Sequence, residues 1–391
     1  MEVVGQAARM NGLMSAIFTQ MDVLRQARVS EGKDVITLSI GSPDMPPAKH
    51  IMRALTEAVN DAERYGYTLS KGNADLLDVI ASWYRHKFNV SLDARNEIHS
   101  LMGSQDGLAH LSLCLVNPGD VVLVPDPGYP IYTAGPLIAG AEIHYMPLRP
   151  ENHYLPDLGA ISEDVLRRTK LMILNYPNNP LAAIAPKEFF TQVVDLAQRY
   201  SFVVCHDFAY SELVFDGYRP DSFLSVPGAK EIGIELHSLS KTYNMAGCRI
   251  GFAVGNARVI ELLGRLKSNI DYGVFYPVQQ AAIAALSGSQ QCVKDLAAMY
   301  QRRRDVLVDG LKRTGWNIPK PKASMFLWAP VPTRQTSLAF TVDLLQNTGI
   351  AVIPGIAFGA CGEGFVRIAL VQPEDRLAEG VNRVANWLEK L

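Results

Sequence analysis

Lys241 stands among side chains that are suited to bind a phosphate group. The stretch SLSKTYNMAGCRIGF, residues 238 to 252, brings it together with the hydroxyls of Ser238 and Ser240 and with the guanidinium of Arg249. Hydroxyls donate hydrogen bonds, and a planar guanidinium binds a phosphate through two parallel ones. A lone lysine indicates little, because most lysines are solvated. A lysine beside a phosphate-binding set, however, is what a Schiff base with pyridoxal phosphate requires.

Such a cofactor needs an acid that keeps a proton on its pyridine nitrogen, so that the ring accepts the electron pair released at the substrate Cα. Asp207 ends the apolar run FVVCHDF, where a carboxylate is costly unless it is paired with a cation. Tyr210 and Asn179, the latter in NYPNNP, can hydrogen-bond the phenolic oxygen of the cofactor. Alone, Asp207 could cap a helix and Asn179 could form a turn. Together with the lysine stretch, they predict a cofactor site.

A turn before a helical pattern offers further phosphate donors. Gly103, Ser104 and Gln105 lie in LMGSQDG, directly before a run with helical periodicity. Backbone N–H groups and the helix dipole attract phosphate at such a helix start. Tyr129, in PDPGYPIY, can stack on the pyridine ring; the alternative is a buried aromatic residue beside proline turns.

Apolar strands and helices alternate through the middle of the chain. Strands are predicted at 121–125, 170–177, 202–208 and 249–255, and a helix at 186–200, where Pro186 can open the first turn. This alternation predicts an α/β fold with a mostly parallel central sheet. Polar Gly- and Pro-rich connections follow the strands, and ligands bind at that edge of open α/β sheets.

With 391 residues, the chain can form a large domain with a smaller partner. After about residue 285 the pattern changes to a charged helical segment, then to short strands and a last helix at 373–390. We predict a large cofactor domain at 39–285 and a smaller α+β domain at 286–391. Residues 1–38 are predicted to form an N-terminal arm and part of the smaller domain.

Composition and missing motifs argue against several other classes. The 37 Lys and Arg balance 39 Asp and Glu, so neither nucleic acid nor a membrane is an expected partner. The run Arg302–Arg304 is expected to be a solvated helix face. The five cysteines form no CxxC pair and the eight histidines no HExxH, so no metal site is expected. A dehydrogenase is disfavoured, because no GxGxxG follows a strand.

No apolar run approaches the ~18 residues of a spanning helix, and the first residues lack the pattern of a secretory signal. The expected location is therefore the cytoplasm.

Several long sequence segments of the chain resemble those of the fold-type I, pyridoxal-phosphate-dependent aminotransferases of class I/II. The resemblance extends over nearly the full length. The phrases VNPGDVVLVPDPGYPIY, NYPNNP, FDGYRPDSFLSVPGAK and IELHSLSKTYNMAGCRIGFAVGNA are similar to the LL-diaminopimelate aminotransferase branch. Methionine-salvage and aspartate aminotransferases share many of these sequence motifs.

The resemblance implies a role for each residue. Lys241 is then the Schiff-base lysine and Asp207 the partner of the pyridine nitrogen. Tyr210 and Asn179 bind the phenolic oxygen, and Arg367, in GFVRIAL, binds the substrate α-carboxylate. The phosphate is surrounded by Ser104, Gln105, Ser238, Ser240 and Arg249, and Gly41 lies on the loop that covers the substrate. Two residues are implied to act on a neighbouring subunit. Tyr67 reaches the phosphate of that subunit, with Gly72 at the matching spacing, and Asn269 approaches its site.

Arg367 also has a physical reason for its assignment. A guanidinium can hold a carboxylate through two parallel hydrogen bonds and thereby orient the Cα–H bond. The alternative is a surface ion pair, which its apolar strand pattern disfavours.

The chain departs from the family pattern at a few positions. Leu181 and Ala182 stand where relatives usually have Thr-Gly, and Cys248 where Trp or Leu is usual. Gln105 replaces a lysine that diaminopimelate enzymes often carry.

The resemblance implies transfer of an amino group from an L-amino acid to a 2-oxo acid by a ping-pong mechanism, with Lys241, Asp207 and Tyr210 as catalytic residues. LL-diaminopimelate, aspartate and methionine are the candidate donors, and a homodimer is implied by Tyr67. One alternative is a pyridoxal-phosphate-dependent C–S β-lyase, which needs no acceptor. Another is a ligand-sensing regulator with an aminotransferase-like domain; the ~38 N-terminal residues are too short for a winged helix-turn-helix.

Overall fold

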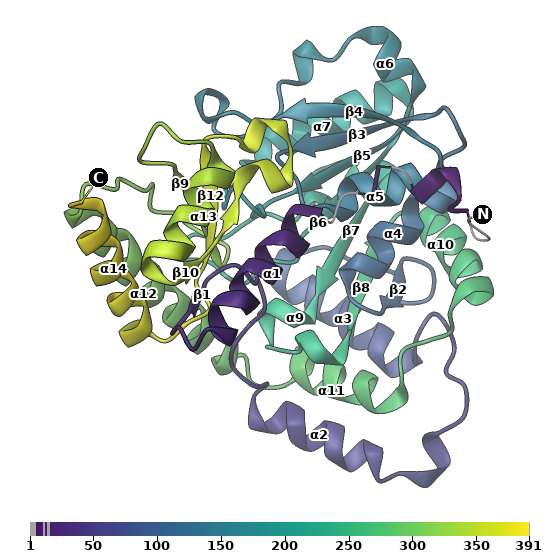
Figure 1. Ribbon diagram of the computed structural model, residues 1–391. Helices are drawn as coiled ribbons and strands as arrows, with labels where there is room; N and C mark the ends of the chain where they lie inside the picture. Colours follow the sequence, from purple (N-terminus) through teal and green to yellow (C-terminus); the bar gives the residue numbers. More distant parts are fainter. Residues whose placement is uncertain (1–4, 11, 14–15, 391) are drawn as a thin grey trace.

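A seven-stranded sheet forms the centre of the computed structural model, which describes residues 5–10, 12–13 and 16–390 (Figure 1). Its strand order is β2-β8-β7-β6-β5-β3-β4. The five strands from β7 to β4 are parallel, whereas β8 is antiparallel to both of its neighbours. The strands are β2 Ile98–Leu101, β3 Val121–Asp126, β4 Glu142–Pro147, β5 Thr169–Asn175, β6 Val203–Asp207, β7 Gly233–Ser238 and β8 Gly251–Gly255. The predicted mostly parallel sheet is confirmed.

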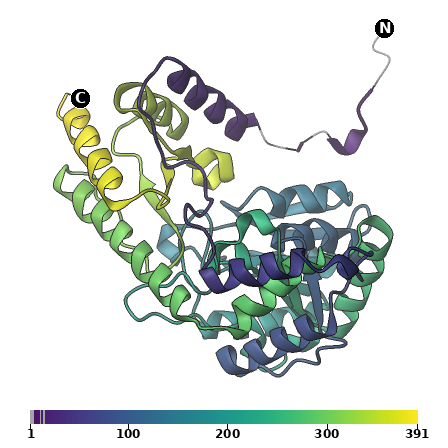
Figure 2. The same cartoon turned by 90° about the horizontal axis from the view of Figure 1, so that it is seen from below.

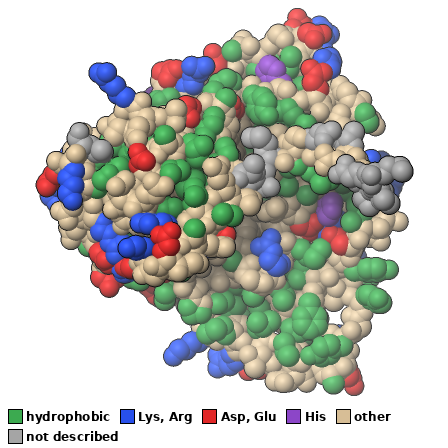
Figure 3. Space-filling view, viewed as in Figure 1, with side chains coloured by type: hydrophobic (Ala, Val, Ile, Leu, Met, Phe, Trp, Pro, Cys, Tyr) green, Lys and Arg blue, Asp and Glu red, His purple; other side chains and the backbone are tan. Residues whose placement is uncertain are grey.

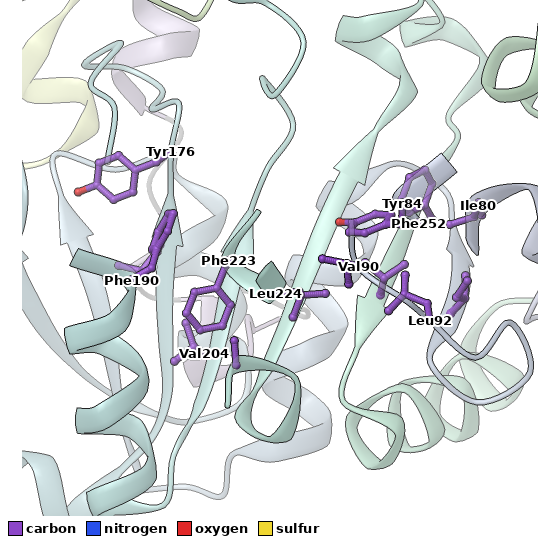
Figure 4. Packing of buried hydrophobic residues seen from close by; sticks show 14 of the residues in the cluster. Ile80, Tyr84, Val90, Leu92, Tyr176, Phe190, Val204, Phe223, Leu224 and Phe252 are labelled. Atoms are coloured by element: carbon purple, nitrogen blue, oxygen red, sulfur yellow. The ribbon is translucent and has the colours of Figure 1, made fainter. Parts of the chain in front are cut away.

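Helices cover both faces of the sheet because its strands are apolar on both sides. In β3, Val121 and Leu123 belong to one buried cluster, and Val122 and Val124 to another. Figure 4 shows part of the first cluster, in which Phe190 of a helix and Phe223 pack beside the sheet. The helices of this part are α2 Lys49–Val59, α3 Ala74–Phe88, α4 Ser104–Leu115, α5 Ile131–Ile138, α6 Glu163–Arg168, α7 Lys187–Tyr200, α8 Ala229–Ile232, α9 Leu239–Thr242, α10 Ala257–Ile270 and α11 Tyr276–Ser287.

The strand predicted at 249–255 begins two residues later than expected. Arg249 has φ 51°, in the left-handed region, so it belongs to the turn before β8. Pro186 precedes α7 as its N-cap rather than opening its first turn. Both differences lie at element ends, where backbone conformation is set by local turns.

A second, smaller group of elements lies beside the sheet. It contains the antiparallel sheet β11-β12-β9 and the parallel pair β1-β10. In Figure 2 its long helices lie side by side at one end of the molecule, and α1 lies against α13. The elements are α1 Ala16–Ser30, β1 Ile36–Thr37, α12 Gln291–Arg313, β9 Phe326–Pro330, α13 Ser337–Thr348, β10 Ile350–Ala351, β11 Ile353–Pro354, β12 Phe365–Ala369 and α14 Glu374–Leu388.

Helix α12 joins the two groups. Val293, in its first turn, belongs to the core beneath the seven-stranded sheet, whereas Leu296 belongs to the core of the smaller group. Ile36 and Leu38 also lie in the smaller core, so the chain enters that group before it builds the central sheet. The predicted N-terminal arm includes residues 1–4, 11 and 14–15, which lie outside the described residues.

The expectation of a solvated Arg302–Arg304 face is wrong for two of the three residues. Arg303 and Arg304 are 3% and 1% exposed, and only Arg302 lies on the surface. Asp44 accepts two hydrogen bonds from Arg303 at 2.7 Å, and Asp216 pairs with Arg304 at 2.6 Å. A charge pattern does not show which helix face meets a carboxylate from elsewhere in the chain.

None of the helices among residues 16–390 is long and apolar enough to cross a bilayer.

Candidate active site

A cavity of about 700 Å³ opens at the carboxyl ends of the parallel strands, between the two groups of elements. Figure 3 shows the molecule hollowed between them. The sequence-predicted residues that line this cavity are Gly41, Ser104, Gln105, Tyr129, Asn179, Asp207, Tyr210, Ser238, Ser240, Lys241, Arg249 and Arg367. They come from seven separate stretches of sequence, which the sheet edge and β12 bring together.

Lys241 lies in the short helix α9, directly after β7. Its Nζ donates a hydrogen bond to the carbonyl oxygen of Gly41 at 2.7 Å. Burial and the positive charges of Arg367 and Arg249 lower the pKa of Lys241 to about 8, although Asp207 opposes the shift. An amine with a lowered pKa is neutral more often near physiological pH, as a nucleophile or proton acceptor must be.

Asp207 is the last residue of β6, and only 4% of it is exposed. The hydroxyl of Tyr132 donates to its Oδ2 at 2.7 Å, and the backbone N–H of Ala209 lies 3.3 Å from its Oδ1. Burial raises the pKa of Asp207, while Tyr132 acts in the opposite direction. Among the described residues, no cationic side chain bonds to this carboxylate from the cavity, and a protonated ring nitrogen would supply such a partner.

A hydrogen-bonded chain joins Tyr210, Asn179 and Arg367. The side chain of Asn179 bonds to the phenol of Tyr210, and its Oδ1 accepts a hydrogen bond from Nη1 of Arg367 at 2.9 Å. Burial raises the pKa of Tyr210, so this phenol stays protonated and can donate. All three residues are at least nine-tenths buried.

Arg367 is held by apolar and polar contacts together. Its guanidinium lies over the rings of Phe326 and Phe358, 4.3 and 4.8 Å from their centroids. Nη2 donates to the carbonyl of Ser39 at 2.8 Å, whereas the buried Nε has no partner in the described part of the chain. Burial lowers its pKa to about 10, which leaves it charged at neutral pH. A buried cation with an unpaired N–H is suited to bind an anion.

A cradle of hydrogen-bond donors also lines the cavity. Ser240 Oγ is buried and has no partner among the described residues, and Ser238 caps α9 through a bond from Ser240 N. The guanidinium of Arg249 approaches Gly103 so closely that a Cβ there would lie 2.8 Å from Nη2. Gly103 has φ 83° and directly precedes α4, whose first N–H groups lack intrahelical acceptors. The donors fit a phosphate dianion.

Tyr129 and Gln105 form the rim of this cradle. The hydroxyl of Tyr129 donates to Oε1 of Gln105 at 3.2 Å. Burial raises the pKa of Tyr129.

Two predicted residues lie away from the cavity of this single chain. Tyr67 is 92% exposed and its ring stands 5.0 Å from that of Tyr272. Asn269 is exposed on α10 and donates to the carbonyl of Arg265. Both were predicted to act on a neighbouring subunit, and their positions leave that prediction open. Gly72 has φ 100° and packs against Ser100.

A compact charged cluster supports the cradle from behind. The Nζ of Lys267 lies 2.6 Å from Asp106 and 2.9 Å from Asp271, and Nδ1 of His110 lies 2.6 Å from Asp106. Asp106 accepts the N–H of Met102 at 2.8 Å, which ties the turn before α4 in place. Three of these groups are close enough for a metal ion, but the ammonium of Lys267 already contacts both carboxylates.

Comparison with known proteins agrees with this arrangement. The sequence pattern of the family described as aminotransferase class I and II matches residues 33–384. The chain belongs to this family. Proteins named LL-diaminopimelate aminotransferase from Desulforudis audaxviator and Moorella thermoacetica are 48% and 47% identical to it over 386 residues, which is 99% of the chain and 98% and 99% of the relatives.

The solved structures agree with the sequence relatives. The structure named probable N-succinyldiaminopimelate aminotransferase, from Thermus thermophilus, superposes with a TM-score of 0.90 at 39% identity. The match covers 95% of the chain and 99% of that structure. The protein is therefore a pyridoxal-phosphate-dependent aminotransferase with the predicted fold-type I architecture, and it acts on amino acids and 2-oxo acids. The lyase and the ligand-sensing regulator are not favoured.

Two supporting residues of this aminotransferase escaped the sequence analysis. Tyr132 bonds to Asp207. It lies in the first turn of α5, three residues after the predicted cofactor residue Tyr129, and this spacing was the only sequence signal for its role. Asn175 donates to the carbonyl of Asp207 at 2.7 Å and accepts the N–H of Asn179 at 2.7 Å. Asn175 is the first residue of the motif NYPNNP, in which only Asn179 was predicted to bind the cofactor.

Proposed function

We propose that Lys241, Asp207 and Tyr210 carry out amino transfer in the cavity described above. The observation that carries the proposal is the position of Lys241, which lines one cavity with the donor cradle and with Arg367 and is close enough to Arg249 and Arg367 for their charges to lower its pKa. Pyridoxal phosphate supplies an aldehyde for the amino group and a ring that accepts an electron pair. Arg249, Ser104, Ser238 and Ser240 would hold its phosphate, and Asp207 its ring nitrogen.

The chain's own groups account for the remaining steps. Arg367 binds the α-carboxylate of the amino acid, since its Nε is free to donate. The neutral amine of Lys241 accepts the proton of the substrate Cα. It would then donate this proton to C4′, the aldehyde carbon of the cofactor. The hydroxyl of Tyr210, kept protonated by burial, donates to the cofactor's phenolic oxygen. Because one substrate leaves before the next enters, ping-pong kinetics follow.

LL-diaminopimelate is the proposed amino donor. Support comes from the two relatives that carry this name at 47–48% identity over nearly the whole chain. Asp22, in the cavity wall, offers negative charge for a second ammonium group, although Arg25 pairs with it at 2.7 Å.

A donor with an apolar side chain, such as methionine, is the second candidate. Phe18, Ile40 and Ile131 line the cavity. Its cations among the described lining residues are Lys241, Arg249 and Arg367, and Gln105 stands where diaminopimelate enzymes often carry lysine. The described part of the cavity wall therefore offers no additional cation for a distal carboxylate such as that of aspartate.

A panel of amino donors with 2-oxoglutarate as acceptor separates these candidates. We expect the largest kcat/KM with LL-diaminopimelate. A larger kcat/KM with methionine would establish the second candidate, and acceptor-independent release of ammonia would contradict amino transfer altogether.

A homodimer is proposed from one exposed surface. The aromatic patch is defined by residues that are each at least 44% exposed: Tyr65, Tyr67, Leu69, Ile270, Tyr272 and Phe275. Figure 3 shows apolar side chains gathered in the region of α2 and α11. The patch residues belong to the segments 65–69, which follows α2, and 270–275, which precedes α11. Contiguous apolar surface of this kind is typical of an interface. There Tyr67 would reach the phosphate of the neighbouring subunit, and Asn269 its site.

The division of the chain is also a proposal. Residues 39–285 would form the cofactor domain, and 286–391 with part of 1–38 the smaller domain. A cytoplasmic location remains a prediction.

A further inference from the structure

A buried polar cluster lies behind the cofactor end of the central sheet. His206 of β6 stands opposite Glu235 of β7, and both are 0% exposed. Successive residues of a strand point to opposite faces, so His206 faces away from the cavity that its neighbour Asp207 lines. Tyr84 also belongs to the cluster, and Figure 4 shows it beside Phe252 of β8. The proposed mechanism makes no use of these groups.

Four donors converge on Glu235. Its Oε1 lies 2.8 Å from His206 Nδ1 and 2.7 Å from the N–H of Phe223. Its Oε2 lies 2.9 Å from the hydroxyl of Tyr84 and 2.5 Å from that of Ser222. Burial alone would raise the pKa of Glu235, but the bond and charge of His206, together with smaller effects of His237 and Ser222, lower it. A carboxylate with this many donors keeps its negative charge.

His206 then has acceptors at both ring nitrogens. Nδ1 faces the Glu235 carboxylate, and Nε2 lies 3.0 Å from the carbonyl oxygen of Tyr176. Neither acceptor can donate a proton, so both ring nitrogens must carry one, and the ring is an imidazolium. Tyr176 lies three residues before Asn179, on the loop that follows β5.

We propose that His206 is a positioning residue for the active site. Its Nε2 fixes the loop that bears Asn179, and its charge lies behind Asp207 and stabilises the ionised form of that carboxylate. This inference rests on the proposed function of Asp207. Stability alone does not account for the pair, since a buried ion pair is often no more stabilising than apolar packing.

The positive charge acts together with the other groups near Asp207. His206 lowers the pKa of Asp207, as Lys241 does, against the larger effect of burial. The titratable and charged groups that face Asp207 or the pair from the neighbouring elements are Tyr132, Cys205, Tyr210, Lys241, Tyr84 and His237. His237 lies on the same strand as Glu235, and burial lowers its pKa to about 3, so it adds no charge near neutral pH.

The test compares binding of pyridoxal phosphate to apoenzymes across pH. His206→Gln keeps a hydrogen-bonding side chain but removes the charge. As the control, Asp216→Asn removes the negative charge that pairs with the buried Arg304, and neither residue lines the cavity. We expect His206→Gln to weaken binding about tenfold and to move the acid limb of the binding profile to higher pH, because Asp207 would ionise less readily. Asp216→Asn should leave that limb in place.

If His206→Gln binds pyridoxal phosphate like the wild type at every pH, the inference is overturned. If the wild type itself binds no pyridoxal phosphate, the proposed function is overturned instead. Neutron diffraction from the wild-type holoenzyme needs no variant. It should locate hydrogen on both ring nitrogens of His206, and a single ring hydrogen would equally refute the imidazolium.

Discussion

Nη1 of Arg367 donates to Oδ1 of Asn179 at 2.9 Å, across the boundary between the smaller group of elements and the central sheet. Arg367 comes from β12, and Asn179 from the loop after β5. Because Asn179 also bonds to Tyr210, the groups proposed to hold the substrate carboxylate and the cofactor oxygen form one connected unit. Displacement of Arg367 should therefore also change the position of Tyr210, and the reverse should hold.

Replacement of Arg367 tests the carboxylate site. Lysine keeps the charge but lacks the planar fork, so Arg367→Lys should raise the KM for the amino donor by about 10- to 100-fold. Arg304→Lys is the matched control, because Arg304 is also buried yet does not line the cavity. Steady-state kinetics at several donor concentrations give the answer. Equal KM values for both variants would remove Arg367 from the substrate site.

Tyr132→Phe tests the support of Asp207. The change removes only the hydroxyl that donates to Oδ2 at 2.7 Å, and it leaves the ring packing intact. The buried carboxylate then loses a donor, so its ionised form is destabilised by about 1–3 kcal/mol. We expect kcat to fall by roughly tenfold or more, with weaker cofactor retention during dialysis. Tyr145→Phe, on the exposed strand β4, should behave like the wild type.

The lowered pKa of Lys241 predicts how apoenzyme stability depends on pH. The amine loses its proton near pH 8 in the folded state but only near its usual 10.5 when unfolded. Between these values the unfolded state binds more protons, so the wild type gains stability as pH rises. Relative to Lys241→Met, its free energy of unfolding should rise through this window by at most about 1.4 kcal/mol per pH unit. A pH-independent difference in urea titrations would contradict the buried amine.

Mixing two inactive variants tests whether sites are shared between subunits. Lys241→Ala and Tyr67→Ala disable different residues, and a mixed dimer would place both defects in one site and leave the other intact. After unfolding and refolding together at equal amounts, about a quarter of wild-type activity should return. Refolding each variant alone is the control. If the mixture is no more active than its parts, Tyr67 does not act across an interface.

The sequence was sufficient for the fold class and for most residues of the cavity. Lys241, Asp207 and Asn179 stand at strand ends, and parallel strands bring such ends to one edge. Arg367 joins them from β12, more than 120 residues after Lys241, and only the family resemblance placed it there.

The supporting contacts could not be predicted in the same way. Asn175 and Tyr132 act through bonds to residues 32 and 75 positions away, which no local pattern shows. The buried pairing of Arg303 with Asp44 spans 259 positions, and for that reason the expectation of a solvated face was wrong. Local sequence indicates strands and turns, whereas long-range partners depend on how the elements pack.

The most direct test is the visible absorbance and the turnover of Lys241→Ala, purified in the presence of pyridoxal phosphate. Burial and the neighbouring cations give Lys241 its lowered pKa, and no other lysine lines the cavity in the described chain. The account predicts that the variant loses the absorbance band of the covalently bound cofactor and at least about 10³-fold in kcat. A variant that keeps both the band and the turnover would contradict it.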